Sequence, residues 1–148
     1  MKRIGWIRHE FVDYIPTDIQ TGTVYISLEY STAVHKCCCG CGAEVVTPLS
    51  PTDWKLSFDG ETVSLTPSIG NWSLECQSHY WIEDGIVRWA ERWSQKEIQE
   101  GRARDREAKR RYFEKRRASD VDVAGAGKAD SHTHKAVGPG LRSRVKKP

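Results

Sequence analysis

Apolar and polar residues alternate along much of residues 1–91, and this period of two is typical of half-buried β-strands. Asp59-Gly60 and Asp84-Gly85 are two-residue turn signals, and each predicts a hairpin between the strands on either side of it. A loop is predicted over residues 67–71, where a proline interrupts the alternation. The predicted strands cover residues 23–30, 32–36, 43–47, 54–58, 62–66, 72–82 and 86–89, and an edge strand is expected near residues 4–7.

The pattern changes after residue 91. Ser94 and Glu97 have the spacing of a capping box, which marks the start of a helix. Residues 95–118 are rich in Glu, Lys, Arg, Gln and Ala and contain no proline. They predict a solvent-exposed helix held by i, i+4 ion pairs such as Glu107–Arg111. From residue 119 onward the chain is rich in small and polar residues and lacks aromatic ones, so disorder is expected there.

The charge divides the chain at the same place. Residues 1–91 hold 6 Lys and Arg against 12 Asp and Glu, whereas residues 92–148 hold 17 against 8. We therefore expect an acidic folded domain (1–91), a charged helix (92–118) and a disordered basic tail (119–148).

The N-terminus is charged too early for a secretion signal, and no apolar run approaches the roughly 20 residues of a membrane span. A cytoplasmic protein without membrane contact is expected.

Four of the five cysteines lie between positions 37 and 41, and the fifth, Cys76, lies in a later apolar run. Thiols this close cannot pair as disulfides with one another without backbone strain, whereas zinc gathers thiolates into a tetrahedron. Alternation places Cys37, Cys39 and Cys41 on one side of the chain and turns Cys38 outward. We predict a zinc site formed by Cys37, Cys39, Cys41 and Cys76 at the tip of a hairpin, which would stabilise a small core.

Other arrangements of these residues stay open. His35 or His79 could replace one thiolate, and the plain alternative is a set of small buried thiols in a β-rich core. Four thiolates leave no open position for water, so the zinc is expected to be structural, and a hydrolytic zinc with three thiolates and a water is less favoured. The expected fold is mainly β: a small antiparallel zinc-stabilised β domain, followed by one charged C-terminal helix and a disordered tail.

Three residues could carry nucleophilic chemistry. Ser68 lies in the predicted loop, and Ser78 and His79 lie in the strand that carries Cys76. A serine becomes a nucleophile when a histidine about 3 Å away takes its proton. Alternation turns Ser78 and His79 to opposite faces, whereas a bend after Ser68 would bring its hydroxyl to His79. A turn-forming serine and a histidine packed beside tryptophan are the ordinary structural roles of the same residues.

The groups that would assist this chemistry are less well marked by the sequence. Asp53, Glu83 and Asp84 are candidates to orient the imidazole ring, and periodicity does not choose among them. Backbone N–H groups near Gly70 and Asn71 are candidates to bind an oxyanion.

Four sequence blocks, in order, resemble a small bacterial domain family of the BubE type, which is associated with bacterial ubiquitin-like conjugation genes. Its members carry Cys-Pro-Cys-Gly-Cys-Gly where this chain has Cys37 to Gly42, so that Cys38 stands in place of the proline. The resemblance covers roughly residues 23–90. The blocks are HKCCCGCG (35–42), LTPSI (65–69), CQSHYWI (76–82) and GIVRW (85–89).

This resemblance implies a zinc-stabilised fold with a serine nucleophile and a histidine base. It also implies a serine peptidase that processes or removes a ubiquitin-like modifier, so the expected partner is a ubiquitin-like protein or its conjugates. The candidate catalytic residues are Ser68, Ser78 and His79. The resemblance does not choose between the two serines, and the alternation of the strand favours Ser68.

A non-catalytic zinc-knuckle binding module is the alternative function. The basic runs 109–111 and 115–117, together with the tail, would contact nucleic acid weakly by neutralising phosphates. The interleaved glutamates favour a simpler interpretation, in which the charged helix is a solvated surface.

Overall fold

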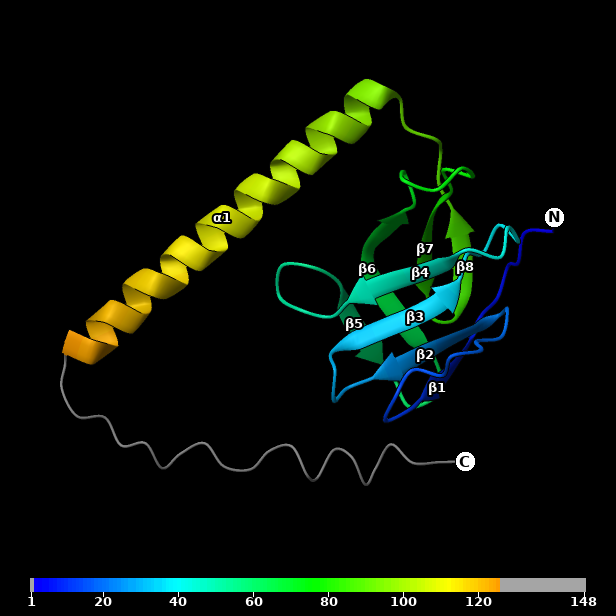
Figure 1. The fold of residues 1–148 in the computed structure, drawn as a ribbon, viewed down its shortest axis with the longest axis horizontal. Coiled ribbons are helices and arrows are strands. Elements are labelled where there is room, and N and C mark those ends of the chain that lie inside the picture. Colours follow the sequence, from blue (N-terminus) through cyan, green and yellow to red (C-terminus); the bar gives the residue numbers. More distant parts are fainter. Residues whose placement is uncertain (1, 126–148) are drawn as a thin grey trace. The chain divides into compact units, whose positions relative to one another are not determined.

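The computed structural model describes residues 2–125, which form eight β-strands followed by one α-helix (Figure 1). The chain divides into two compact units, of which the first ends at Ile98 and the second begins at Gln99. The mainly β fold with one C-terminal helix is confirmed. Residues 126–148 of the predicted tail lie outside the described residues. The elements are β1 (Arg8–Phe11), β2 (Thr23–Ser27), β3 (Thr32–Lys36), β4 (Glu44–Pro48), β5 (Lys55–Phe58), β6 (Val63–Gly70), β7 (His79–Glu83), β8 (Ile86–Trp89) and α1 (Gln95–Gly125).

One sheet contains β1, β2, β3 and β4 in that order. β1 runs parallel to β2, and the other neighbours are antiparallel. β3 has its predicted bounds, but β2 ends at Ser27 rather than at residue 30. The chain turns there because the Ser27 hydroxyl accepts the N–H of Tyr30, and Ser31 has a positive φ of 47°.

The second sheet contains β5, β6, β7 and β8 in that order, and all of its neighbours are antiparallel. Asp84 and Gly85, with φ of 50° and 75°, form the predicted tight turn between β7 and β8. The turn predicted at Asp59-Gly60 is longer than two residues, since Phe58 and Val63 form the last pair of β5 and β6. The Asp59 carboxylate accepts two backbone N–H groups within this loop, which makes the longer turn favourable.

Two sequence predictions fail between residues 66 and 79. β6 continues to Gly70, through the predicted loop, because its pairing with β7 shifts register between Leu65 and Ile69. Pro67 lies in this irregular part, where its missing N–H costs no ladder hydrogen bond. The strand predicted over residues 72–82 begins only at His79. Residues 71–78 form consecutive turns instead, and the positive φ of Gln77 (44°) is incompatible with a strand.

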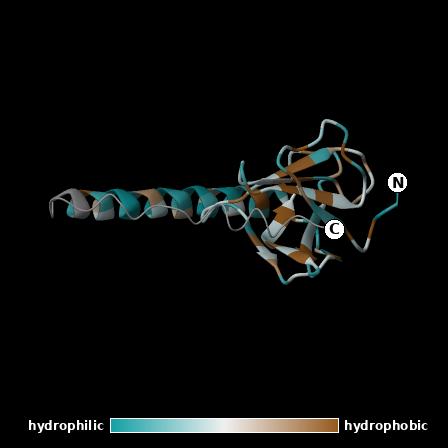
Figure 2. Cartoon of the chain, turned by 90° about the horizontal axis from the view of Figure 1, so that it is seen from below, coloured by the Kyte–Doolittle hydropathy of each residue, from teal (hydrophilic) through white to brown (hydrophobic). Residues whose placement is uncertain are grey.

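A single apolar core joins the two sheets. Val24 and Ile26 of β2 belong to the same buried cluster as Leu65 of β6 and Ile82 of β7. Burying one such side chain contributes about 1.5–3 kcal/mol, so this shared core is the main attraction between the sheets. Figure 2 shows the corresponding hydrophobic positions along the strands.

The N-terminal segment links the two sheets. Gly5 and Ile7 exchange backbone hydrogen bonds with Val87 and Gly85 at the edge of the second sheet. The chain then enters β1 of the first sheet, and residue Ile4 donates its N–H to the carbonyl of Cys38. This segment therefore covers an edge of the second sheet and touches the cysteine loop.

The capping box at the start of α1 is confirmed. The Glu97 N–H is donated to the Ser94 hydroxyl, and the Ser94 N–H is donated to the Glu97 carboxylate at 2.7 Å. Ile98, in the first turn of the helix, is buried within the first unit. The helix continues to Gly125, seven residues beyond its predicted end.

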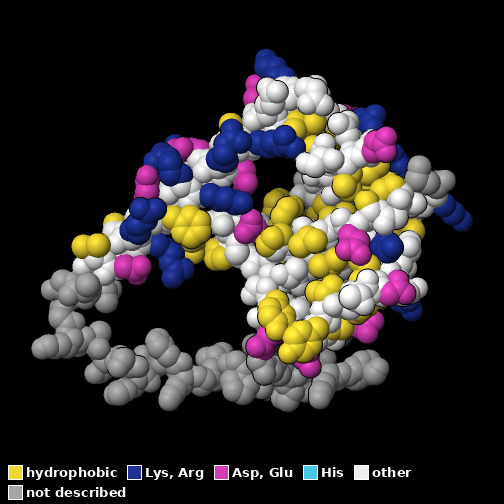
Figure 3. All heavy atoms as spheres, in the orientation of Figure 1, with side chains coloured by type: hydrophobic (Ala, Val, Ile, Leu, Met, Phe, Trp, Pro, Cys, Tyr) yellow, Lys and Arg dark blue, Asp and Glu magenta, His cyan; other side chains and the backbone are white. Residues whose placement is uncertain are grey.

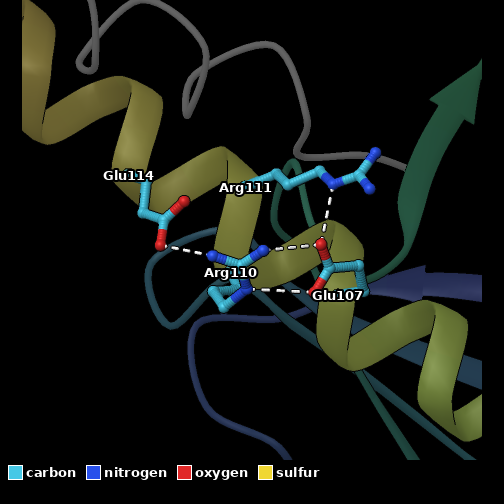
Figure 4. A network of polar contacts seen from close by, with 4 residues as sticks. All are labelled: Glu107, Arg110, Arg111 and Glu114. Atoms are coloured by element: carbon cyan, nitrogen blue, oxygen red, sulfur yellow. Dashed lines mark hydrogen bonds and ion pairs between the residues drawn. The ribbon is translucent and has the colours of Figure 1, made fainter.

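The body of α1 is held by ion pairs rather than by an apolar face. The predicted pair of Glu107 and Arg111 forms at 2.8 Å, and Arg110 bridges Glu107 and Glu114 (Figure 4). Basic and acidic side chains are interleaved along the helix in Figure 3. Each exposed pair of this kind contributes only about 0.3–0.5 kcal/mol, so a network is needed to stabilise the helix.

Within residues 2–125, no helix has the length and apolar character that a membrane crossing requires.

Two glycines of the cysteine loop provide a matched test of the N-terminal segment. Gly40 and Gly42 both have positive φ, so alanine at either position costs about 1–2 kcal/mol. A Cβ at Gly40 would also lie 2.8 Å from the backbone oxygen of Lys2, whereas a Cβ at Gly42 meets nothing within 4 Å. Gly40→Ala should therefore lower the free energy of urea unfolding by a further 1–3 kcal/mol or so compared with Gly42→Ala. Equal losses would mean that the N-terminal segment is not fixed over the loop.

Candidate functional site

Four thiols meet where the hairpin between β3 and β4 approaches the turns between β6 and β7. Cys37 follows β3 directly, Cys39 and Cys41 lie in the hairpin loop, and Cys76 comes from the later turns. Their four Sγ atoms all lie within 4.8 Å of one another. Cys76 Sγ is 3.8 Å from the Sγ atoms of Cys37 and Cys41, and Cys37 Sγ is 3.5 Å from Cys39 Sγ. These are the four cysteines chosen from the sequence, and they could hold a metal ion.

Cys38 does not point outward as predicted. It is fully buried and packs in the apolar core that joins the sheets. Burial raises the pKa of its thiol to about 12, so it stays neutral. The alternation of the sequence correctly separated Cys38 from the other thiols, but the second side of this hairpin faces the core rather than solvent.

The clustered thiols differ in how readily they ionise. Burial raises the pKa of the Cys37 thiol. Burial also opposes ionisation of Cys76, but hydrogen bonds from the side chain and backbone of Ser78 lower the pKa of the Cys76 thiol to about 7. A bound cation would complete the deprotonation of the group, because metal binding favours thiolates.

Ser78 belongs to the cysteine cluster rather than to the histidine. Its Oγ lies 3.0 Å from Cys37 Sγ and 3.5 Å from Cys76 Sγ, and it accepts a hydrogen bond of 2.9 Å from the Asn71 amide. Ser78 is 8% exposed. The Asn71 N–H, a predicted oxyanion donor, is already donated to the Ser78 carbonyl.

A buried polar network crosses the core beside the thiols. The Tyr80 hydroxyl accepts the N–H of Cys38 and an N–H of the Asn71 side chain, and it lies 2.8 Å from His35 Nε2. Because both acceptor sites of the hydroxyl are occupied, its proton is donated to His35 Nε2. Burial lowers the pKa of His35 to about 4 and keeps the ring neutral. His35 thus pairs with Tyr80 and is not one of the four clustered ligands.

The structure brings Ser68 and His79 together. His79 Nε2 lies 2.9 Å from Ser68 Oγ, within hydrogen-bond distance. Ser68 lies on β6 and is half-buried, and His79 begins β7 and is 5% exposed. The register pairs Gly70 with His79, which places Ser68 diagonally across from the histidine on the same side of the sheet. His79 does not belong to the cysteine cluster.

A backbone carbonyl contacts the other nitrogen of His79. The Nδ1 atom lies 3.0 Å from the carbonyl oxygen of Glu91, which accepts the ring N–H. The carboxylates considered from the sequence have other partners: Asp53 accepts a hydrogen bond from Ser50, Glu83 pairs with Arg88, and Asp84 accepts one from Ser64. Sequence patterns give no signal for the Glu91 carbonyl, because a backbone group can come from any residue type.

Three tryptophans surround the His79 ring. The ring centroids of Trp72, Trp81 and Trp93 lie 5.0, 5.6 and 5.1 Å from the His79 centroid. Trp72 and Trp93 also stack on each other with centroids 5.4 Å apart. Trp72 reaches this position because residue 70 is glycine: a Cβ there would lie 2.4 Å from the Trp72 indole nitrogen. These indoles shield the imidazole from water on the side of the sheet that faces away from the core.

Residues 11–90 match the family described as bacterial ubiquitination-like system serine protease (BubE). The chain belongs to this family. The BubE match contains the four clustered cysteines, Ser68 and His79, and it ends one residue before Glu91. No curated protein and no solved structure gives a significant match to the chain. The BubE description implies a serine-protease-like role in a bacterial ubiquitination-like system.

The Tyr80 hydroxyl provides a test of the buried network. Tyr80→Phe removes the partner of His35 Nε2 and leaves the Cys38 N–H and Asn71 amide less satisfied. The free energy of unfolding should fall by about 2–4 kcal/mol, since each buried group left unpaired costs about 1–3 kcal/mol. Tyr25→Phe removes one hydrogen bond, from the N–H of Gln20, and should cost about 1 kcal/mol. If urea unfolding showed the same loss of unfolding free energy for Tyr80→Phe and Tyr25→Phe, the Tyr80 hydroxyl would not be the shared partner of three buried groups.

Proposed function

We propose that this protein is a serine peptidase in which Ser68 is the nucleophile and His79 the general base, acting on peptide or isopeptide bonds of a ubiquitin-like modifier. The observation that carries the proposal is the 2.9 Å contact between His79 Nε2 and Ser68 Oγ. Membership of the BubE family supports the reaction class and the pathway. The expected partner is a ubiquitin-like protein or one of its conjugates.

The hydrogen bond to Glu91 sets the tautomer that this chemistry needs. Because His79 Nδ1–H is donated to the Glu91 carbonyl, Nε2 carries the lone pair and accepts the Ser68 hydroxyl proton. Ser68 Oγ then attacks the substrate carbonyl, and His79 passes the proton to the leaving amine as the C–N bond breaks. Water deprotonated by His79 hydrolyses the acyl-enzyme, and Ser68 regains its proton.

The partner of His79 Nδ1 is a carbonyl rather than a carboxylate, so it does not stabilise a positive charge on the ring as strongly. The Glu91 carbonyl fixes ring orientation and tautomer as a carboxylate would, but it carries no net charge to stabilise the imidazolium. The tryptophans around the ring shield it from water. We therefore infer a Ser–His dyad whose base is oriented by the backbone.

Ser78 is the weaker candidate for the nucleophile. Its hydroxyl contacts two thiols and the Asn71 amide. These groups hold it in place, no histidine within residues 2–125 hydrogen-bonds to its hydroxyl, and thiolates committed to a bound metal would not act as a base. We propose that Ser78 supports the cysteine cluster, while Ser68 attacks the substrate.

The four thiols fit a structural zinc ion. A tetrahedron with Zn–S bonds of about 2.3 Å has edges of about 3.8 Å. Three of the sulfur separations, Cys37–Cys39, Cys37–Cys76 and Cys41–Cys76, are 3.5 to 3.8 Å and thus close to this edge length, and all four sulfurs lie within 4.8 Å of one another. When bound, the ion would supply a positive charge that holds the thiolates and cross-links the two loops. Four thiolates fill the tetrahedron, so we assign no hydrolytic role to the metal.

The cysteines also bear on the cellular location. All five are free thiols, which favours a reducing, cytoplasmic compartment.

For the alternative of nucleic-acid binding, residues 126–148 of the basic tail lie outside the described residues, and Lys109, Arg110 and Arg111 of the helix pair with acidic side chains. We therefore favour the peptidase over a nucleic-acid-binding module.

Replacement of each serine separates their roles. Ser68→Ala should abolish labelling by a fluorophosphonate probe, because the attacking oxygen is gone. Ser78→Ala should still be labelled, at a rate within about tenfold of the wild type. Labelling is read by intact-protein mass spectrometry, and thermal unfolding checks that both variants are folded. Loss of labelling only in Ser78→Ala would contradict the assignment of Ser68.

Zinc binding can be tested with the fifth cysteine as the control. Purified wild-type protein should contain one zinc ion per chain by elemental analysis. Cys76→Ala should weaken zinc affinity at least about a hundredfold, since it removes a thiolate ligand, and should lower thermal stability. Cys38→Ala, which changes the only cysteine outside the cluster, should keep the full zinc content. A folded wild-type protein without metal would contradict the structural role of zinc.

A further inference from the structure

The outer edge of β6 loses its partner shortly before Ser68. β5 pairs with β6 only from Lys55–Thr66 to Phe58–Val63, yet β6 continues to Gly70. Within residues 2–125, no other strand pairs with β6 on the side that β5 occupies. Residues 67–70 therefore have no partner strand on the side of β5, and Ile69 and Gly70 pair with β7 on the other side.

The backbone of Gly70 turns toward this open edge. The next residue, Asn71, donates its N–H to the Ser78 carbonyl, and the His79 carbonyl accepts an N–H from Ala90 on its other side. Hydrogen-bonded and non-hydrogen-bonded pairs alternate in an antiparallel ladder, so the pair of Gly70 and His79 is of the second kind. The N–H and C=O of Gly70 consequently point away from β7.

This edge is accessible and lies beside the proposed nucleophile. Thr66, Pro67 and Gly70 are exposed, and Ser68 between them is half-buried. A strand added to the edge would run about 4.8 Å from the backbone of β6. Its carbonyl groups would then pass within reach of the Ser68 hydroxyl, which stands on the same strand. Addition of an extended peptide as a strand to an open sheet edge is a common mode of peptide recognition.

We propose that the polypeptide substrate binds as an added β-strand along residues 67–70 of β6, in the position that β5 leaves vacant, with its backbone paired to the N–H and C=O of Gly70. This proposal rests on the proposed peptidase function. It defines the substrate class as an extended chain end or linker at least three residues long. A helix or a tightly folded loop would not present free backbone groups to this edge. A substrate with a methylated amide facing Gly70 is also excluded, because it lacks the required N–H.

The aromatic residues next to the edge are consistent with such a substrate. Trp72 packs against the Gly70 position and Trp81 shares the face of His79, so side chains of an added strand on that face would contact indole rings. Glycine at position 70 is needed twice, for the approach of Trp72 and for an unobstructed backbone. Ile69 points to the core and is 1% exposed, so it takes no part in the contact.

Two phosphonate probes that carry the same warhead test the proposal. The short probe is the diphenyl phosphonate analogue of N-acetylalanine, and the long probe has two further alanines on its N-terminal side. Ser68 Oγ forms a P–O bond to either probe, phenoxide leaves, and His79 takes the serine proton. The second-order labelling rate should be at least about tenfold higher for the long probe, since one added hydrogen bond of about 1.4 kcal/mol corresponds to that factor. N-methylation of the one amide that faces Gly70 should abolish the gain, and N-methylation of the next amide should not.

Amide hydrogen exchange followed by NMR locates the contact. In the long adduct, exchange of the Gly70 N–H should slow at least about tenfold relative to the short adduct, whereas the already paired Ile69 N–H should not change. Equal labelling rates for the two probes, or an unchanged Gly70 exchange rate in the long adduct, would overturn strand addition while leaving Ser68 as the nucleophile. If neither the phosphonates nor a fluorophosphonate label Ser68, the proposed peptidase function fails, and the substrate proposal fails with it.

Discussion

The meeting of Cys76 with the thiols of the β3–β4 hairpin is the contact on which the site depends. Cys37 and Cys76 are 39 residues apart in sequence, and their sulfurs lie 3.8 Å apart. Residues 71–78 have turns but no strand pairing of their own, and the contacts of Cys76 with the hairpin thiols and of the Asn71 side chain with Tyr80 join them to the rest of the domain. The hydrogen bond from Asn71 to Ser78 closes this segment, and His79 follows it directly. The segment that carries Cys76 is thus directly followed in the chain by the proposed base.

The second requirement is the register of β6 against β7. Side chains alternate between the faces of a strand, so a shift of one residue would move Ser68 to the other face of the sheet. The register shift between Leu65 and Ile69 preserves the alternation, because Leu65 and Ile69 are both buried in the core, and Ser68 lies with His79 on the other face. Beyond it, β6 has one free edge. On the opposite side of β6, the ladder with β5 ends at Thr66, and this is what leaves the backbone available to the proposed extended substrate.

The buried polar network around Tyr80 and the proposed catalytic pair lie on different faces of the second sheet. Tyr80, His35, Asn71 and Ser78 form a buried hydrogen-bonded network beside the thiols, in which His35 Nδ1 alone is left without a partner among the described residues. Ser68 and His79 lie on the opposite face of the second sheet, behind tryptophans. Adjacent residues on β7 thus have different roles: Tyr80 packs in the core, and His79 contacts Ser68 on the other face of the sheet. The proposed nucleophilic chemistry is thereby placed on one face of the second sheet.

The sequence by itself determined the strands with clear alternation, the capping box at Ser94, the charged helix and the choice of the four clustered cysteines. These features depend on local periodicity and on the chemistry of thiols, which are properties of neighbouring residues. Only the tertiary structure decided that residues 71–78 turn, that β6 runs through Pro67, that Cys38 is buried, and that a carbonyl at Glu91 holds His79. Those outcomes depend on which distant segments pack together: backbone carbonyls carry no sequence signal, and a register shift is set by packing across the sheet rather than by the strand itself.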